Sequence, residues 1–188
     1  GEYSADYAFA NNVGLNDVSL SGKLISITKL FYACASLKKV YLDNCDLSDC
    51  DSSDFCFSGS GITNCDLSNT NFKVTGTCNE MFSNCVNLRT ITLPSGSLNK
   101  CTSLRHFATG CINLEAINIG AQEFGDIPTS EDSLSMCPIK SITGTIVNIG
   151  KNSPSFGIGN RSQLDALSVN MIINGLYDNS GNPTKKLL

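Results

Sequence analysis

Apolar residues recur along this chain at a fixed spacing. Between Leu37 and Leu47 the apolar slots are filled by Leu37, Val40, Leu42 and Leu47. Five further copies fill the same four slots: Leu15, Val18, Leu20 and Ile25; Ile62, Cys65, Leu67 and Phe72; Leu88, Ile91, Leu93 and Leu98; Leu114, Ile117, Ile119 and Phe124; Ile139, Ile142, Gly144 and Ile149. The first members of successive copies are 22, 25, 26, 26 and 25 residues apart, and a period of this length is typical of stacked repeat proteins.

The middle of each copy has the spacing of a short β-strand. Alternate side chains of a strand share a face, so Val40 and Leu42 point inward while Tyr41 points outward. One copy cannot bury its apolar side alone, but copies stacked at the ~4.8 Å spacing of a parallel sheet turn each slot into a continuous column. Each large apolar side chain buried in such a column contributes roughly 1.5 to 3 kcal/mol. The sequence therefore predicts a solenoid in which equivalent residues, such as Leu37 and Ile62, stack through one core.

A second regular segment precedes each strand. It reads AFANNVGL, LFYACASL, MFSNCVNL and FATGCINL, with a degenerate copy FCFSGSGI. An aromatic or other apolar residue followed by a small residue or cysteine suits a tight helical turn or an irregular bend, and the segments are too short for a stable α-helix. We expect these segments to form the outer wall.

The stretch MFSNCVNLRTITLPSGSL resembles the leucine-rich repeats of the BspA-like bacterial surface proteins (the Treponema pallidum type), in which F-x-N-C precedes L-x-x-I-x-L-P. The resemblance covers about residues 8–149 and is most specific from Met81 to Pro94. It implies a leucine-rich-repeat solenoid that is right-handed and curved, of the α/β horseshoe class but predominantly β. Its parallel sheet lies on the concave side, with short helical turns or loops outside. The chain departs from the pattern because only Pro94 follows a strand and Gly144 replaces a large rung.

The C-terminal region breaks the period. Val169, Ile172, Ile173 and Leu176 follow helical spacing, which predicts a capping helix within about 163–178 that covers the last rung. Either Ser162 or Ser168 could cap its start, and Gly181 lies just past its end. The alternative is an amphipathic helix that binds a partner's groove. We expect a single domain over 1–188, with six repeats over 8–149, a loop over 150–161 and the helical cap over 162–188.

Composition excludes several classes of function. The chain has 188 residues, of which 41% are hydrophobic and 16% charged, and its net charge is -4. An acidic chain has no general attraction for phosphate backbones, so we expect no nucleic-acid partner. No apolar run reaches the length of a membrane span, so any membrane anchor would lie in segments outside this sequence.

Ten cysteines leave two interpretations open. Close Cys pairs with histidine, as zinc requires, do not occur. Cys34, Cys85 and Cys111 share one slot of the repeat, which favours a column of small buried thiols. One or two disulfides near Cys45, Cys50 and Cys56 remain the alternative if the protein is exported.

Candidate chemistry is sparse. His106 is the only histidine, no nucleophile motif accompanies it, and a surface or capping role is expected. The acidic run DNCDLSDCDSSD lacks the glycine and distal glutamate of a calcium loop, so a solvated acidic ridge is preferred to a calcium site. A GxG in 150–161 lacks the strand, third glycine and helix of a dinucleotide site. We therefore expect no catalytic residue, no metal ligand, no cofactor and no enzymatic activity.

The outward positions of the strands form the candidate ligand-binding surface, called the concave face below. Its residues are Lys39, Tyr41, Asp43, Asp66, Thr90, Thr92, Asn118 and Thr143. Hydroxyl, amide and carboxylate groups on a rigid sheet suit hydrogen bonding to an extended protein or glycan partner, although polar residues can also simply solvate an exposed sheet. The family resemblance implies a non-catalytic recognition module, extracellular or on a bacterial cell surface, that acts in adhesion or host interaction. The alternative is a structural spacer or stalk with no ligand of its own.

Overall fold

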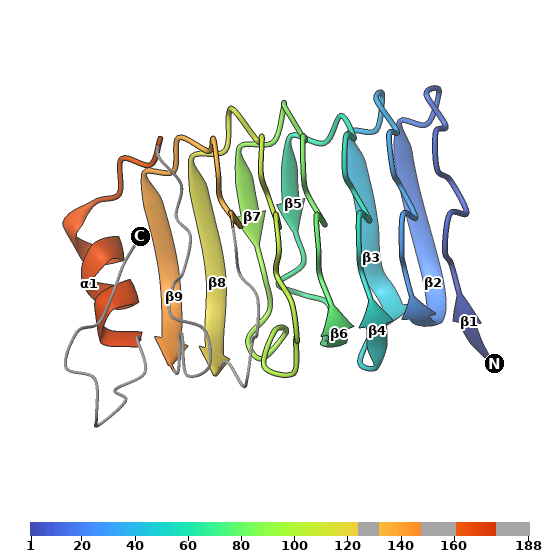
Figure 1. The fold of residues 1–188 in the computed structure, drawn as a ribbon. Helices are drawn as coiled ribbons and strands as arrows, with labels where there is room; N and C mark the ends of the chain where they lie inside the picture. The colour runs from blue at the N-terminus through green and yellow to red at the C-terminus, as the bar shows by residue number, and fades with distance from the viewer. Residues whose placement is uncertain (124–131, 148–160, 176–188) are drawn as a thin grey trace.

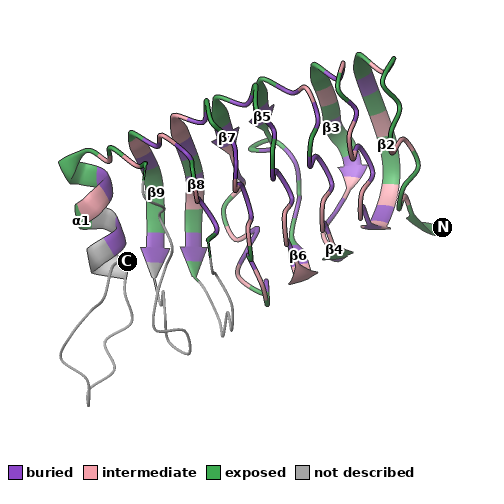
Figure 2. Ribbon diagram, turned by 45° about the horizontal axis from the view of Figure 1, so that its top comes forward, coloured by how far each residue is buried: buried purple, intermediate pink, exposed green. Residues whose placement is uncertain are grey.

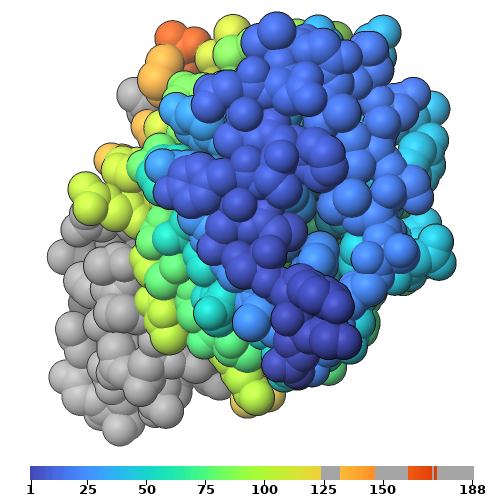
Figure 3. All heavy atoms as spheres, turned by 90° about the vertical axis from the view of Figure 1, so that its right-hand side faces the viewer, coloured from blue at the N-terminus to red at the C-terminus, as the bar shows by residue number. Residues whose placement is uncertain are grey.

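The computed structural model describes residues 1–123, 132–147 and 161–175. These residues form a right-handed solenoid of parallel strands closed by one helix (Figure 1). Viewed onto the N-terminal end, the first turns cover much of those behind them (Figure 3). The elements are β1 (Glu2–Ser4), β2 (Asp17–Ser26), β3 (Lys39–Asp46), β4 (Cys50–Ser52), β5 (Asn64–Asp66), β6 (Val74–Thr77), β7 (Thr90–Thr92), β8 (Ala116–Glu123), β9 (Ser141–Val147) and α1 (Ala166–Gly175).

One strand of each repeat lies where the periodic pattern predicts it. β2, β3, β5, β7, β8 and β9 each begin two residues after the first apolar slot of a copy and lie side by side in one row (Figure 1). The register pairs Cys65 with Ile91, Ile91 with Ile117 and Ile117 with Ile142, all parallel. Equivalent side chains therefore stack in columns, and the predicted leucine-rich-repeat solenoid is confirmed.

The row of strands is interrupted between β3 and β5. β3 pairs with β2, and β5 pairs with β7, but these two fully described neighbours share no ladder. In the second, fourth, fifth and sixth repeats the residue after the first slot, such as Arg89, donates its backbone N–H to the preceding turn. In the third repeat Gly61 instead donates to Cys34 O at 3.1 Å. The degenerate segment FCFSGSGI thus enters its strand in a different register.

A second row of strand pairing lies at the carboxyl ends of these strands, and the sequence pattern did not predict it. β1, the end of β2, β4 and β6 pair in that order, and a bridge from Thr77 to Ser103 extends the row (Figure 1). Each described turn from the second to the fourth therefore pairs with its neighbours at two places along its length.

The outer wall consists of turns with an alternating hydrogen-bond pattern. Phe31, for example, donates its N–H to Cys56 O of the next turn at 2.8 Å, whereas Tyr32 donates to Lys29 O of its own turn. Residues with positive φ recur four apart in each copy: Tyr7 and Asn11, Lys29 and Ala33, Phe55 and Gly59, Glu80 and Asn84, His106 and Gly110, Asp132 and Met136. The left-handed residues let successive amides point alternately within the turn and toward its neighbour.

The interior contains the predicted apolar columns and a stack of phenylalanine rings. Leu37, Leu88 and Leu114 are fully buried, and buried positions alternate with exposed ones along the strands (Figure 2). The ring centroids of Phe9, Phe31, Phe57 and Phe82 follow one another at 5.7, 5.4 and 5.4 Å with nearly parallel planes. Ala108 occupies the equivalent slot of the fifth repeat, and Phe107, one residue earlier, meets Phe82 edge-on at 5.3 Å.

Helix α1 covers the last described strand, which confirms the predicted capping helix. Ile172 is completely buried, and the Ser168 hydroxyl accepts a hydrogen bond from Ile142 N (2.8 Å) and donates one to Ile142 O (3.1 Å). The backbone N–H and C=O of Ile142, at the edge of the sheet, are therefore hydrogen-bonded by a side chain of the helix. The expected N-cap was wrong: Asp165 caps the helix, because its Oδ1 accepts the Ser168 N–H at 2.7 Å.

The glycine in the third slot of the last copy has a structural reason. Gly144 has φ 120°, beside an irregularity between β8 and β9, and a Cβ on it would lie 2.1 Å from Gly120 O. Close approach of the two backbones thus requires glycine. The slots at Phe124 and Ile149, the loop 150–161 except its last residue, and Leu176 and Gly181 lie outside the described residues, and the proposed domain division stays a prediction.

Candidate functional site

The eight residues of the concave face lie on five strands. Lys39, Tyr41 and Asp43 are on β3, Asp66 on β5, Thr90 and Thr92 on β7, Asn118 on β8 and Thr143 on β9. Thr92 is half-buried and the other seven are exposed. The ladders place Asp66, Thr92, Asn118 and Thr143 in one column across four adjacent strands. The structure therefore brings five of the eight onto one continuous sheet.

Three of these side chains already make hydrogen bonds within the protein. Thr90 Oγ1 donates to Asn64 Oδ1 on the neighbouring strand at 2.7 Å. Asp66 Oδ1 accepts the Ser68 N–H at 2.9 Å, and Asn118 Oδ1 accepts the Gly120 N–H at 3.0 Å. Asp66 and Asn118 thus shape the turns that follow their strands, and part of their hydrogen-bonding capacity is used there.

The other three residues lie across the interruption of the sheet. Tyr41 is the aromatic side chain of the face, is 49% exposed and pairs in register with Ser19 of β2. Lys39 and Asp43 flank it on the outward side of β3. A ligand that spans the whole face would have to bridge two separately hydrogen-bonded sheets.

An aromatic cluster on the outer wall was missed from the sequence. The Nζ of Lys29 lies 5.2, 5.7 and 5.1 Å from the ring centroids of Tyr7, Tyr32 and Phe55, within cation–π range. Tyr7, Lys29 and Phe55 occupy the same slot in three successive turns, and Tyr32 meets Phe55 edge-on at 6.4 Å. Stacking of successive copies created this cluster, and only an alignment of the outer-wall segments could have revealed it.

The family-level comparison agrees with this architecture. Residues 3–130 match the BspA type leucine rich repeat region in six copies. The chain belongs to the BspA-type leucine-rich-repeat family. Members of this family are often surface or secreted proteins, and the repeats are generally non-catalytic scaffolds for protein interaction. Neither a curated protein nor a solved structure matches the chain significantly.

In this BspA-type solenoid all ten cysteines are buried and unpaired by disulfides, as the column interpretation predicted. The thiols of Cys34, Cys85 and Cys111 each donate to a carbonyl oxygen of the preceding turn, at 3.0, 2.9 and 2.9 Å. Burial raises the pKa of Cys50 to about 12 and also raises the pKa of Cys56. The thiols of Cys50 and Cys56 therefore stay protonated at neutral pH and are poor nucleophiles or metal ligands.

The acidic run does not converge on one point. Asp46 Oδ1 accepts from the Asn71 amide at 2.6 Å, Asp54 Oδ1 accepts the Asn79 N–H at 2.6 Å, and Asp49 lies 3.4 Å from Lys23 Nζ. Hydrogen bonds from Ser48 and Asn71 lower the pKa of Asp46. Over the described ranges 1–123, 132–147 and 161–175, no group of three or more His, Cys, Asp or Glu residues is arranged to hold a metal ion.

His106 lies half-buried on the outer wall of the BspA-type array with φ 54°. Its Nδ1 is buried and has no hydrogen-bond partner among the described residues. No Ser, Cys or acidic side chain in the described part of the chain hydrogen-bonds to this nitrogen. As for membranes, the part of the chain that the structure describes has no helix long and apolar enough to cross a bilayer.

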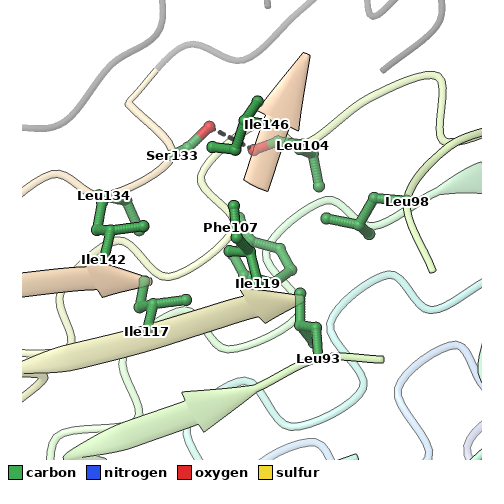
Figure 4. Close-up of a pocket in the computed structure, with 10 residues that line it drawn as sticks. All are labelled: Leu93, Leu98, Leu104, Phe107, Ile117, Ile119, Ser133, Leu134, Ile142 and Ile146. Carbon is green, nitrogen blue, oxygen red and sulfur yellow. Dashed lines mark hydrogen bonds between the residues drawn. The ribbon is translucent and has the colours of Figure 1, made fainter. Parts of the chain in front are cut away.

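A small apolar cavity lies in the core beside the end of the phenylalanine stack (Figure 4). Its volume is about 40 Å³, and it is lined by Leu104, Phe107, Ile117, Ile119, Leu134 and neighbouring apolar residues. Its one polar side chain, Ser133, donates to Leu104 O at 2.8 Å. A cavity of this size and lining is a packing defect rather than a binding pocket.

Proposed function

We propose that this chain is a non-catalytic recognition module of a cell-surface or secreted bacterial protein that binds an extended protein or glycan partner through the concave face. The column formed by Asp66, Thr92, Asn118 and Thr143 across β5, β7, β8 and β9 carries the proposal. A rigid sheet presents these groups at fixed intervals, so a partner with its own regular spacing meets them without ordering the protein. Adhesion or host interaction would follow from this binding.

The face has few strong anchors. Hot spots of interfaces favour Trp, Tyr and Arg, and Tyr41 alone supplies such a side chain there. We therefore expect modest affinity for one module and stronger binding when several copies act together on a multivalent surface.

The internal hydrogen bonds of Asp66, Thr90 and Asn118 favour a second candidate, a structural spacer or stalk. In that case the polar residues solvate the sheet and shape its turns, and the module displays other parts of a larger protein. The two functions differ in whether any ligand depends on Tyr41 and Thr92.

A panel of immobilised host matrix proteins and glycans tests the proposal. Binding of the native chain is compared with that of Tyr41→Ala/Thr92→Ala, and with a matched control, Asn87→Ala/Arg105→Ala, whose residues are exposed but lie off the strands. Loss of a detected interaction in the first variant alone supports the concave face. Binding that both variants retain unchanged would refute the assignment, and the absence of any ligand would favour the spacer.

A further inference from the structure

A polar cleft lies at the edge of the solenoid where the strands of the main row end. Residues 48–49, 73–75, 95–96 and 99–100, from three successive turns, line a volume of about 430 Å³. That volume falls within the range of small-molecule sites. None of the lining residues belongs to the concave face. Strand β6 and the loop after β7, which carry most of them, lie at the edge of the solenoid where the strands end (Figure 1).

The lining is polar and carries both signs of charge. Lys73 and Lys100 are exposed, and neither takes part in an ion pair with any described residue. Asp49 is the acidic residue of the lining, and it shares Lys23 with Glu2, which lies closer to the ammonium group (2.6 Å against 3.4 Å). The lining therefore combines two lysines that are in no described ion pair with one carboxylate that already contacts Lys23, in a chain of net charge -4.

Two further side chains of the cleft are held in place by backbone groups. Ser95 Oγ accepts the Ala121 N–H at 3.1 Å, and Asn99 Oδ1 accepts the Glu123 N–H at 2.8 Å. These bonds leave the Ser95 hydroxyl proton and the Asn99 amide nitrogen as donors. Donors that are already oriented cost little entropy when a ligand binds.

This donor set points to a particular ligand chemistry. Ammonium groups attract an anion, fixed hydroxyl and amide groups bind hydroxyls, and a carboxylate accepts hydrogen bonds from hydroxyls but repels a simple anion. We propose that the cleft binds an acidic sugar unit, with its acid group between Lys73 and Lys100 and its hydroxyls toward Asp49, Ser95 and Asn99. The site is separate from the concave face and does not depend on the function proposed for it.

An NMR titration of the ¹⁵N-labelled chain with sodium glucuronate tests the proposal. Glucuronate should shift the backbone amides of 48–49, 73–75 and 95–100 and leave those of the concave face unchanged. In Lys73→Gln/Lys100→Gln we expect its affinity to fall about tenfold or more, because hydrogen bonds from charged groups are lost. Lys38→Gln/Arg89→Gln is the matched control, since it removes the same charge from exposed residues that lie outside both the cleft and the concave face.

Comparison ligands separate the alternatives. Equal binding of glucose would show that charge plays no part, and equal binding of sodium sulfate would show a mere anion site, so either result overturns the proposal. An equal loss of glucuronate binding in the Lys38/Arg89 control would show non-specific attraction and would also overturn the proposal. Asp49→Asn should lower the affinity for glucuronate without lowering the affinity for sulfate. Stronger binding of both ligands would contradict the role of Asp49 toward sugar hydroxyls. None of these results alters the test with Tyr41→Ala/Thr92→Ala.

Discussion

Replacement of Phe57 by alanine should lower the free energy of unfolding by about 3–5 kcal/mol. The Phe57 side chain is completely buried and its ring stacks on two others, Phe31 and Phe82, at 5.4 Å each. The loss combines the transfer of a large apolar group with the cavity left between two fixed turns. Because both neighbours are tied to the Phe57 turn by backbone hydrogen bonds, the site cannot easily collapse, so we expect a value in the upper half of the range.

Urea denaturation followed by circular dichroism measures this effect. Tyr41→Ala serves as the control, because its side chain is about half exposed, and it should cost well under half as much. A loss below about 1 kcal/mol for Phe57→Ala would refute the view that the ring stack stabilises neighbouring turns.

A double-mutant cycle tests the stack more sharply. Phe57→Leu and Phe82→Leu should show a coupling of about 0.5–1.5 kcal/mol, the value of an aromatic pair beyond its buried area. Phe9 and Phe57 are separated by Phe31, so Phe9→Leu and Phe57→Leu should be additive within about 0.5 kcal/mol. Equal coupling in the two cycles would contradict a nearest-neighbour array.

Three further predictions follow from single contacts. Ser168→Ala should lower the free energy of unfolding, measured by urea denaturation, by about 1–3 kcal/mol, because the buried Ile142 N–H loses its acceptor. An unchanged free energy of unfolding would contradict the capping of β9. Gly61→Ala should lower the free energy of unfolding by about 1–3 kcal/mol or disrupt the third repeat, since a Cβ would lie 2.1 Å from Ala35 O. An unchanged melting temperature would disprove that close approach. Hydrogen bonds from Ser168 lower the pKa of Asp165 in the folded protein. The ionised Asp165 carboxylate therefore stabilises the fold fully above the unfolded pKa of about 4, and this stabilisation is lost as pH falls through the folded pKa. A pH titration of stability should lose this acid-side step in Asp165→Asn, and an identical profile would exclude the cap.

The sequence was sufficient where one physical rule decided the outcome. Leu37, Leu88 and Leu114 recur at a nearly constant period. One repeat cannot bury its own apolar side chains, so the repeats must stack to remove them from water. The same holds for Ile172, which helical spacing placed on the buried side of the C-terminal helix. Burial of the cysteines could be predicted because Cys34, Cys85 and Cys111 share one slot of the repeat, and all three are completely buried.

Features that depend on contacts between copies could not be predicted. Tyr7, Lys29, Phe55 and Glu80 all have positive φ, yet these residue types give no local signal for it. Hydrogen bonds to the next turn compensate for the strain, and those bonds exist only after stacking.

The candidate site shows the same limit. The outward position of Thr90 could be predicted from strand alternation, but its hydrogen bond to Asn64 depends on the register of the neighbouring strand.

Polar residues with structural roles outside the candidate site could not be predicted either. Gln122 is almost fully buried, and its Oε1 accepts the Leu98 N–H at 2.9 Å, although the sequence pattern gave no sign of this role. Asp165 caps the helix by accepting the Ser168 N–H, whereas the Ser168 hydroxyl hydrogen-bonds the backbone at the edge of β9. This second contact joins the helix to the last strand, so helix signals in the sequence could not predict it.

The hydrogen-bonded outer wall has a mechanical consequence. Where helices form the outer side of a repeat protein they pack about 8–10 Å apart, about twice the ~4.8 Å between strands, and the mismatch bends the array into an arc. Here the backbone of each outer turn bonds directly to the next, so both walls advance by nearly the same step. Such an array should curve less from turn to turn than a repeat protein with an outer layer of helices, and pulling two turns apart would break backbone hydrogen bonds on both walls at once.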